Sequence, residues 1–183
     1  DNIFIYQSLP QATLIQLDPS SQSLTELNVN FNDLITEKKG MMNYFGRLYV
    51  LDPRNRQIYR HQRVGDIFTT GDPWVTDESV DLADATAMSI DGNIWVTTKA
   101  GDLYKLSKGT AEELDLALLD PGLNSPNFIW TDVDSAYVYI LDGPTRRVII
   151  LNKDGSIFRQ YVSDKFNDLR AAAVDEANNK VFI

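Results

Sequence analysis

The 183-residue chain contains no cysteine and a single histidine. The lack of cysteine excludes disulfides, thiol catalysis and metal sites built on thiolates. With one histidine, metal sites that use several imidazoles are excluded as well. No apolar run reaches the roughly 18 residues that a membrane-spanning helix needs, and no basic-then-apolar signal segment opens the chain. We therefore expect no metal or other cofactor, and membrane contact only through segments outside this sequence.

Positive charge is also scarce, with 17 Lys and Arg against 26 Asp and Glu and a net charge of −9. Nucleic-acid binding gains much of its affinity by neutralising phosphates, so we expect no nucleic-acid partner. The densest basic cluster, Arg54–Arg63, lies in an expected hairpin. We interpret it as the solvated face of a strand, with an anion or RNA patch as the alternative.

A repeat of short apolar runs is the strongest pattern that is present. The runs recur at intervals of 43 to 46 residues. They begin at Ile3, Leu48, Ile94, Val138 and Val181. The second residue of each run is aromatic: Phe4, Tyr49, Trp95, Tyr139 and Phe182. Aromatic residues make up only 10% of the chain, so five of them in register indicate a structural repeat.

Each complete repeat contains four candidate strands separated by turn-forming residues. A hairpin partner follows the aromatic run, a more polar run comes next, and a run of small or apolar residues precedes the next aromatic run. The polar runs begin at Leu24, Asp66, Glu112 and Ser156, and the small-residue runs at Gly40, Asp84, Pro126 and Leu169. Four short strands at this period are typical of a propeller blade. We predict an all-β chain, a β-propeller of four-stranded antiparallel blades.

The phase of the repeat gives about four blade equivalents in a single partial propeller over residues 1–183. The expected blades are 1–39, which lacks its first strand, 40–83, 84–125, 126–168 and 169–183, the start of a further blade. We expect an arc of a larger propeller, with a closed four-bladed ring as the alternative. An arc exposes apolar blade faces, so we also expect self-association or a partner that covers them.

The stretch from Pro126 to Tyr161, PNFIWTDVDSAYVYILDGPTRRVIILNKDGSIFRQY, resembles an NHL-type propeller blade, and GRLYVLDPRNRQIY from Gly46 resembles it too. The units DGNIWVTTKAGDLYKLSKG and YVYILD…RRVIILNKDGS…QYVSD are similar to propeller domains of uncharacterised, often membrane-tethered bacterial proteins. The resemblance implies the fold and says little about activity. An extracellular or cell-surface location is expected.

The connector Thr69–Thr86 is the least repetitive part of the chain, and loops on a rigid scaffold commonly carry recognition. Trp74 could be an aromatic anchor with an acidic rim for a basic peptide or a sugar. That rim consists of Asp72, Asp77 and Glu78. The alternative is that Trp74 caps the core beneath its own loop. The one histidine, His61, is interpreted as a surface strand residue without a catalytic role.

Three classes of function follow from this pattern. The preferred one is a non-catalytic interaction or sensor platform that binds a protein, peptide or glycan on rim connectors around 72–84, 119–126 and 163–168. The second is a lactonase- or lyase-type propeller enzyme with a metal at the central channel, for which the candidates at the inner-strand ends are Asp84, Asn127 and Asp168. The third is a structural surface component that assembles through open blade edges.

Overall fold

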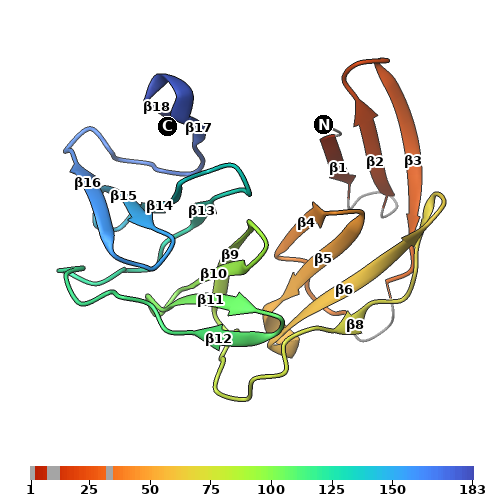
Figure 1. Ribbon diagram of the computed structural model, residues 1–183, viewed down its shortest axis with the longest axis horizontal. Coiled ribbons are helices and arrows are strands. Elements are labelled where there is room, and N and C mark those ends of the chain that lie inside the picture. The colour runs from red at the N-terminus through yellow and green to blue at the C-terminus, as the bar shows by residue number, and fades with distance from the viewer. Residues whose placement is uncertain (1–2, 8–12, 32–34) are drawn as a thin grey trace. The chain divides into compact units, whose positions relative to one another are not determined.

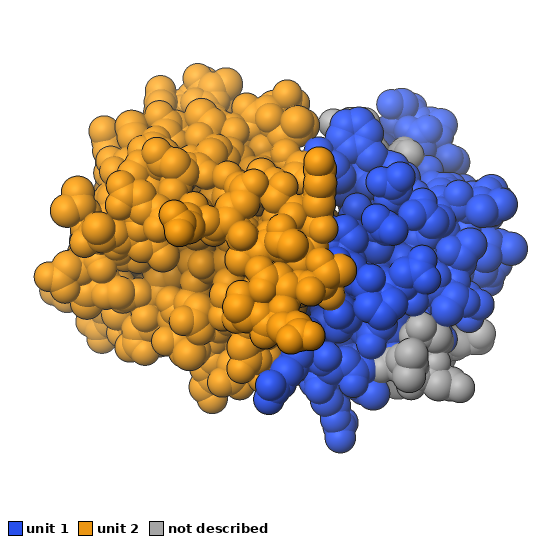
Figure 2. Space-filling view, turned by 60° about the horizontal axis from the view of Figure 1, so that its bottom comes forward, with its two compact units in different colours: residues 1–74 blue, residues 75–183 orange. Residues whose placement is uncertain are grey.

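The computed structural model describes residues 3–7, 13–31 and 35–183, which form strands, turns and two short 3-10 helices (Figure 1). The chain divides into two compact units, residues 1–74 and residues 75–183 (Figure 2). Each unit is described by itself below. Across these described ranges, no helix has the length and apolar character to cross a membrane.

Unit 1 is a single eight-stranded sheet with the order β1-β2-β3-β7-β6-β5-β4, in which β8 also pairs with β6. Its strands are β1 (Ile3–Gln7), β2 (Thr13–Asp18), β3 (Ser23–Val29), β4 (Gly40–Tyr44), β5 (Arg47–Asp52), β6 (Gln57–Val64), β7 (Ile67–Phe68) and β8 (Asp72–Pro73), with the 3-10 helix η1 (Pro53–Asn55) between β5 and β6. All pairs are antiparallel except β3 with β7, which run parallel. Leu14, Leu27, Leu48, Val50 and Phe68 form the centre of its core.

Unit 2 contains two four-stranded antiparallel sheets and a two-stranded hairpin. The first sheet consists of β9 (Ala85–Ile90), β10 (Ile94–Thr98), β11 (Leu103–Ser107) and β12 (Thr110–Glu112). The second consists of β13 (Phe128–Trp130), β14 (Tyr137–Asp142), β15 (Arg147–Asn152) and β16 (Ile157–Val162). The hairpin is β17 (Ala173–Asp175) and β18 (Lys180–Phe182), joined by the 3-10 helix η2 (Glu176–Asn178). Both four-stranded sheets pair in sequence order, as predicted for propeller blades.

Trp95, the aromatic residue of the repeat in the first sheet, packs between the two sheets of unit 2. Trp95 on β10 is fully buried, and its indole Nε1 donates a 2.9 Å hydrogen bond to Asp91. It clusters with Val138, Ile140, Ile149 and Leu151 of the second sheet. The predicted role of the aromatic ladder between blades is therefore confirmed at Trp95.

A side-chain hydrogen bond recurs between successive inner strands of unit 2. The Thr86 hydroxyl donates to the Pro126 carbonyl at 2.5 Å, just before β13. The Asn127 amide donates to the Leu169 carbonyl at 2.7 Å, before β17. The β17–β18 hairpin thus meets the second sheet through the same kind of contact by which the second sheet meets the first.

Two expectations about individual segments are wrong. The polar strand expected from Glu112 to Leu118 is replaced by β12, which ends at Glu112, because Leu114 and Leu116 leave the sheet to pack on the core between the two sheets. His61 on β6 is fully buried instead of solvent-facing. Phe31 contacts its ring edge-on at 5.7 Å, and a Cβ on Gly71 would lie 2.7 Å from Nε2, so the chain folds closely over it.

Candidate binding pocket

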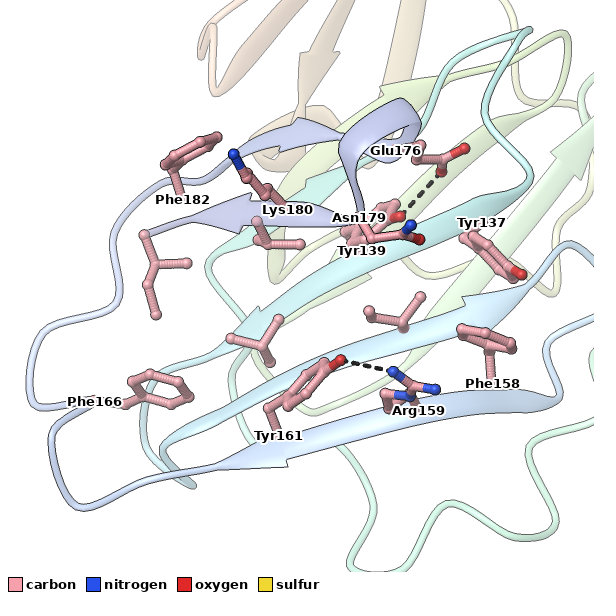
Figure 3. A pocket seen from close by; sticks show the side chains of 14 residues that line it. Tyr137, Tyr139, Phe158, Arg159, Tyr161, Phe166, Glu176, Asn179, Lys180 and Phe182 are labelled. Carbon is pink, nitrogen blue, oxygen red and sulfur yellow. Dashed lines mark hydrogen bonds between the residues drawn. The ribbon is translucent and has the colours of Figure 1, made fainter.

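The second sheet and the β17–β18 hairpin of unit 2 border a pocket of about 630 Å³ that is open to solvent on one side (Figure 3). Its aromatic lining consists of Tyr137, Tyr139, Phe158, Tyr161, Phe166 and Phe182. We call this cavity the aromatic pocket. A volume of this size is typical of sites that hold a small ligand or an anchoring segment of a partner.

The aromatic wall owes its shape to an irregularity in the second sheet. Ile150 pairs with Arg159 but Leu151 pairs with Ile157, so Phe158 is an extra residue in β16. A bulge of this kind re-aims side chains, which allows the neighbours Phe158 and Arg159 both to line the pocket. The Phe158 ring stacks on Tyr137 with 4.3 Å between centroids. Phe158 and Tyr161 remain 45% exposed each, an apolar surface open to solvent.

Two cations border the aromatic pocket although the whole chain carries a net charge of −9. Arg159 donates a 3.1 Å hydrogen bond to the Tyr161 hydroxyl, and its guanidinium lies 5.3 Å from the Phe158 ring centroid. The hydrogen bond with Tyr161 raises the pKa of Arg159. Lys180 is exposed on β18, opposite β16 across the pocket (Figure 3). The rim therefore offers positive charge beside aromatic rings.

Glu176, the carboxylate in the pocket lining, is held by hydrogen bonds from residues of its own chain. It accepts hydrogen bonds from the Ser135 hydroxyl at 2.5 Å, the Ala136 backbone N–H at 3.1 Å and the Tyr139 hydroxyl at 3.0 Å. Burial raises the pKa of Glu176, but these three hydrogen bonds and the positive charge of Lys153 together outweigh it and lower the pKa below its ordinary value. Burial, followed by the bond to Glu176, raises the pKa of Tyr139. The pair fastens the hairpin to the second sheet.

The predicted rim residues in unit 1 are Asp72 and Trp74. Asp72 lies exposed on β8. Trp74 is half-buried and packs edge-on against buried Tyr49 with 6.0 Å between ring centroids. Its backbone N–H donates to the Ile58 carbonyl at 2.8 Å. These contacts agree with the alternative that Trp74 caps the core beneath its own loop.

The predicted rim residues in unit 2 are Asp77 and Glu78. Asp77 accepts hydrogen bonds from the Ser79 hydroxyl at 2.6 Å and the Ala111 N–H at 3.1 Å. These bonds, the one from the Ser79 side chain first, lower the pKa of Asp77. Glu78 is exposed. Asp77 thus ties its connector to the first sheet, and a recognition role for these residues stays a prediction.

The predicted channel-end residues Asp84, Asn127 and Asp168 are all exposed. The Asn127 side-chain amide donates a hydrogen bond to the Leu169 carbonyl, and Asp168 forms an ion pair with Arg170 at 2.9 Å. In the described part of the chain, no three His, Cys, Asp or Glu side chains gather closely enough to hold a metal ion. A catalytic role for the three residues stays a prediction.

Sequence reasoning passed over the aromatic pocket, with one exception. The expected rim connector 163–168 contains Phe166, which lines the pocket. The remaining lining falls on β14, β15, β16 and β18, on the turn of the β17–β18 hairpin and on Ile183 just after β18, all of which the repeat identifies as scaffold. A signal was nevertheless present, because the outer strand expected to be polar carries Phe158 and Tyr161. Aromatic residues on the solvent side of an edge strand are typical of an interaction surface.

No protein-family model and no curated protein sequence matches the chain. Solved structures do. Streptogramin B lyase is 17% identical with a TM-score of 0.55 over 91% of this chain, and the structure of a nidogen/laminin complex is 16% identical with a TM-score of 0.59 over 86%. BamB from Moraxella catarrhalis is 17% identical with a TM-score of 0.54 over 98%.

The chain has the β-propeller fold. The four-stranded antiparallel sheets and the similarity to propeller-like proteins agree on this point. The chain spans about half the length of these solved structures, with 52%, 58% and 50% of each covered. Because the three include a lyase and a member of a protein complex, the fold alone does not select a function.

Proposed function

We propose that the chain is a non-catalytic propeller module that binds a partner protein at the aromatic pocket. The observation that carries this proposal is the pocket itself, about 630 Å³ in volume, with aromatic walls and two cations at its rim. Exposed aromatic residues and arginine are the side chains that most often dominate protein interfaces. Phe158, Tyr161 and Arg159 supply this combination on a single strand.

The hydrogen bonds and the lowered pKa of Glu176 also favour binding over acid–base chemistry at this pocket. A general base works best when its pKa lies near the operating pH and its oxygens are directed at the substrate. Glu176 instead accepts three hydrogen bonds from its own chain and has a lowered pKa. The pocket is therefore better suited to hold an apolar segment than to transform it.

A photo-crosslinking experiment tests the proposal. We would place p-benzoylphenylalanine at position 158 and, as a matched control, at position 45, where Phe45 is 78% exposed on unit 1. The species captured at 158 and absent at 45 would be purified and its affinity measured. Phe158→Ala should weaken binding by about ten-fold or more, as expected for an aromatic anchor, and Phe45→Ala should leave it unchanged. Equal affinity of the wild type and Phe158→Ala would contradict the proposal.

Several finer expectations remain proposals of this kind. They are docking of a protein, peptide or glycan on the rim connectors, kinship with NHL-type repeats, tethering to a bacterial membrane and an extracellular or cell-surface location. Docking on the connectors 72–84 and 119–126 is separable from docking in the aromatic pocket, because neither connector contributes to the pocket lining. Crosslinkers placed in each connector would distinguish the two.

A further inference from the structure

We propose that unit 1 contains a pH-sensitive seam that opens when buried His61 takes up a proton. The seam is the contact between two segments, residues 28–31 at the end of β3 and residues 66–71 around β7, which join β1–β3 to β4–β8 in one sheet. At neutral pH the segments close over His61, and in mildly acidic solution its charge forces them apart. This inference is independent of the aromatic pocket, which lies in unit 2.

The first observation is that β3 and β7 are joined by a short parallel ladder. It consists of the pairs Asn28 with Ile67 and Val29 with Phe68. Hydrogen bonds across the seam run from the Asn28 N–H to the Asp66 carbonyl at 3.0 Å, from the Asn30 N–H to the Phe68 carbonyl at 3.0 Å and from the Asn30 side-chain amide to the Thr70 hydroxyl at 2.9 Å. In the described ranges, the two four-stranded sheets of unit 2 share no such ladder. Because the ladder is short, the seam can open while the strands on either side stay paired.

The second observation is that the same two segments enclose the imidazole of His61. The side chain is fully buried on β6. From the β3 side, Phe31 meets it edge-on with 5.7 Å between the ring centroids. From the β7 side, Thr69 contributes its carbonyl oxygen, and Gly71 comes so close that a Cβ there would lie 2.7 Å from Nε2. A change in the charge of His61 therefore acts on both halves of the seam.

The third observation is that, within the described residues, one of the two ring nitrogens lacks a hydrogen-bond partner. Nδ1 lies 2.7 Å from the Thr69 carbonyl oxygen, which can only accept, so Nδ1 carries the proton of the neutral ring. Nε2 is buried and is the nitrogen without a partner. Protonation would place an N–H and a positive charge there, beside the backbone of Gly71. A buried charge without a partner is strongly unfavourable, and opening of the seam gives the ring access to water.

The charges around the imidazole do not compensate for its burial. The described charged or titratable side chains that lie around it are Tyr6, Lys38, Tyr59, Arg63 and Asp72. Burial raises the pKa of both tyrosines, so they are neutral at these pH values. Lys38 places a cation 4.8 Å from the centroid of the Phe31 ring, and Arg63 pairs with Asp66 at 3.5 Å. Burial lowers the pKa of His61 and outweighs the opposing effects of the Thr69 carbonyl and of Asp72, which is exposed on β8.

The direction of the pH effect follows from this shift. In the open seam His61 ionises at its ordinary pKa of about 6.5, and in the closed seam its pKa is lower. The stability that neutral His61 gives the closed seam is therefore fully present above the open-state pKa and is lost as the pH falls towards the closed-state pKa. One pH unit below the open-state pKa, the equilibrium constant for opening should have risen by up to about ten-fold.

Hydrogen exchange of the seam amides tests the proposal on the full chain. The amides of Asn28 and Asn30 report on the seam, because each donates across it. Their protection factors, which correct for the intrinsic pH dependence of exchange, would be measured at about pH 7.5 and about pH 5.5, one unit on either side of the ordinary histidine pKa. We expect protection of both amides to fall by up to about ten-fold at the lower pH, while amides of β14 and β15 in unit 2 keep theirs. Unchanged protection of Asn28 and Asn30, or an equal loss in unit 2, would overturn the proposal.

A variant that cannot ionise assigns the effect to His61. His61→Gln keeps a side-chain N–H for the Thr69 carbonyl and should abolish the difference in protection between the two pH values. A pH dependence that persists in this variant would belong to another group and overturn the proposal. Asp72→Asn, at an exposed position, removes the anion that favours charged His61. Its loss of protection at the lower pH should be at least as large as in the wild type, and a smaller loss would contradict the account.

The wild-type protein provides a second measurement, which decides the question even if His61→Gln does not fold. His61 is the only histidine in the sequence, so its imidazole resonances in a histidine-labelled sample identify themselves. At about pH 5.5 we expect molecules with a closed seam still to show the neutral ring protonated on Nδ1. A single titration with a midpoint at about pH 6.5, without any change at the seam amides, would show that the closed seam accepts charged His61. That result would overturn the proposal.

Discussion

The Tyr139 hydroxyl donates a 3.0 Å hydrogen bond to Glu176, and this contact joins the aromatic strand of one sheet to the next hairpin of unit 2. Both residues line the aromatic pocket. Glu176 is placed there by η2, whose start is capped by Asp175 through a 3.1 Å bond from the Asn178 N–H. One wall of the pocket therefore depends on a polar contact as well as on packed rings.

The first prediction concerns the strength of this contact. The Ser135 and Tyr139 hydroxyls donate to one oxygen of Glu176 and the Ala136 N–H donates to the other, so the NH2 group of Glu176→Gln must face a donor on one side. We expect the free energy of unfolding at pH 7 to fall by about 1–3 kcal/mol, the cost of unsatisfied hydrogen bonds to a charged group. Urea denaturation measures it. Glu113→Gln, at an exposed site in the same unit, is the control and should change stability little. Equal losses in both variants would contradict the role given to Glu176.

A second prediction is the pH dependence of that effect. The folded pKa of Glu176 is lowered, so its stabilising contribution is present above the unfolded pKa, about 4.3, and is lost as the pH falls through the folded pKa. Protonated Glu176 resembles the Gln variant. The difference in unfolding free energy between wild type and Glu176→Gln should therefore shrink towards zero on acidification. A difference that stays constant down to acid pH would refute the assignment.

Tyrosine ionisation gives a third prediction, at the alkaline end. The pKa of Tyr139 is raised, so its protonated form is favoured by folding, and the stabilisation is fully present below the unfolded pKa of about 10 and is lost as the pH rises through the folded pKa. In a spectrophotometric titration of the folded protein, Tyr139→Phe should remove a tyrosine that ionises at a higher pH than an ordinary tyrosine. Removal of a tyrosine that ionises at about pH 10 would show that folding does not raise the pKa of Tyr139.

The fourth prediction compares two ion pairs in unit 2. Asp142 and Arg147 pair at 2.9 Å, with 0% and 4% of their side chains exposed, and Arg147 also donates to the carbonyls of Pro121 and Gly122. Asp142→Asn should cost about 3–5 kcal/mol because it leaves a buried guanidinium unpaired. The exposed pair Asp168–Arg170 provides the control, and Asp168→Asn should cost about 0–1 kcal/mol. Comparable losses in thermal or urea unfolding would contradict this ranking.

Trp74 supplies a fifth prediction, which separates the two readings of its connector. If Trp74 caps the core through Tyr49, Trp74→Ala should lower the unfolding free energy by about 2 kcal/mol, less than for a fully buried aromatic residue. Trp74→Phe should recover part of this loss. A variant with unchanged stability and weakened partner binding would instead support the recognition role on the rim.

The repeat made the strands of this chain predictable because their positions depend on local pattern. Tyr49, Trp95 and Tyr139 all lie buried on the expected strands. The burial of His61 was not predictable, since Phe31 and Gly71 cover it from other segments. The aromatic pocket was missed for a similar reason. It depends on the extra residue in β16, which turns Phe158 into the cavity, and periodicity does not reveal such a shift.

Hydrogen exchange with and without the partner protein captured by crosslinking at position 158 tests the central claim most directly. Our account predicts slower exchange of backbone amides in β16 and β18, the strands that border the aromatic pocket, and loss of this protection in Phe158→Ala. Protection confined to the rim connectors 72–84 and 119–126, with β16 and β18 unchanged, would contradict it.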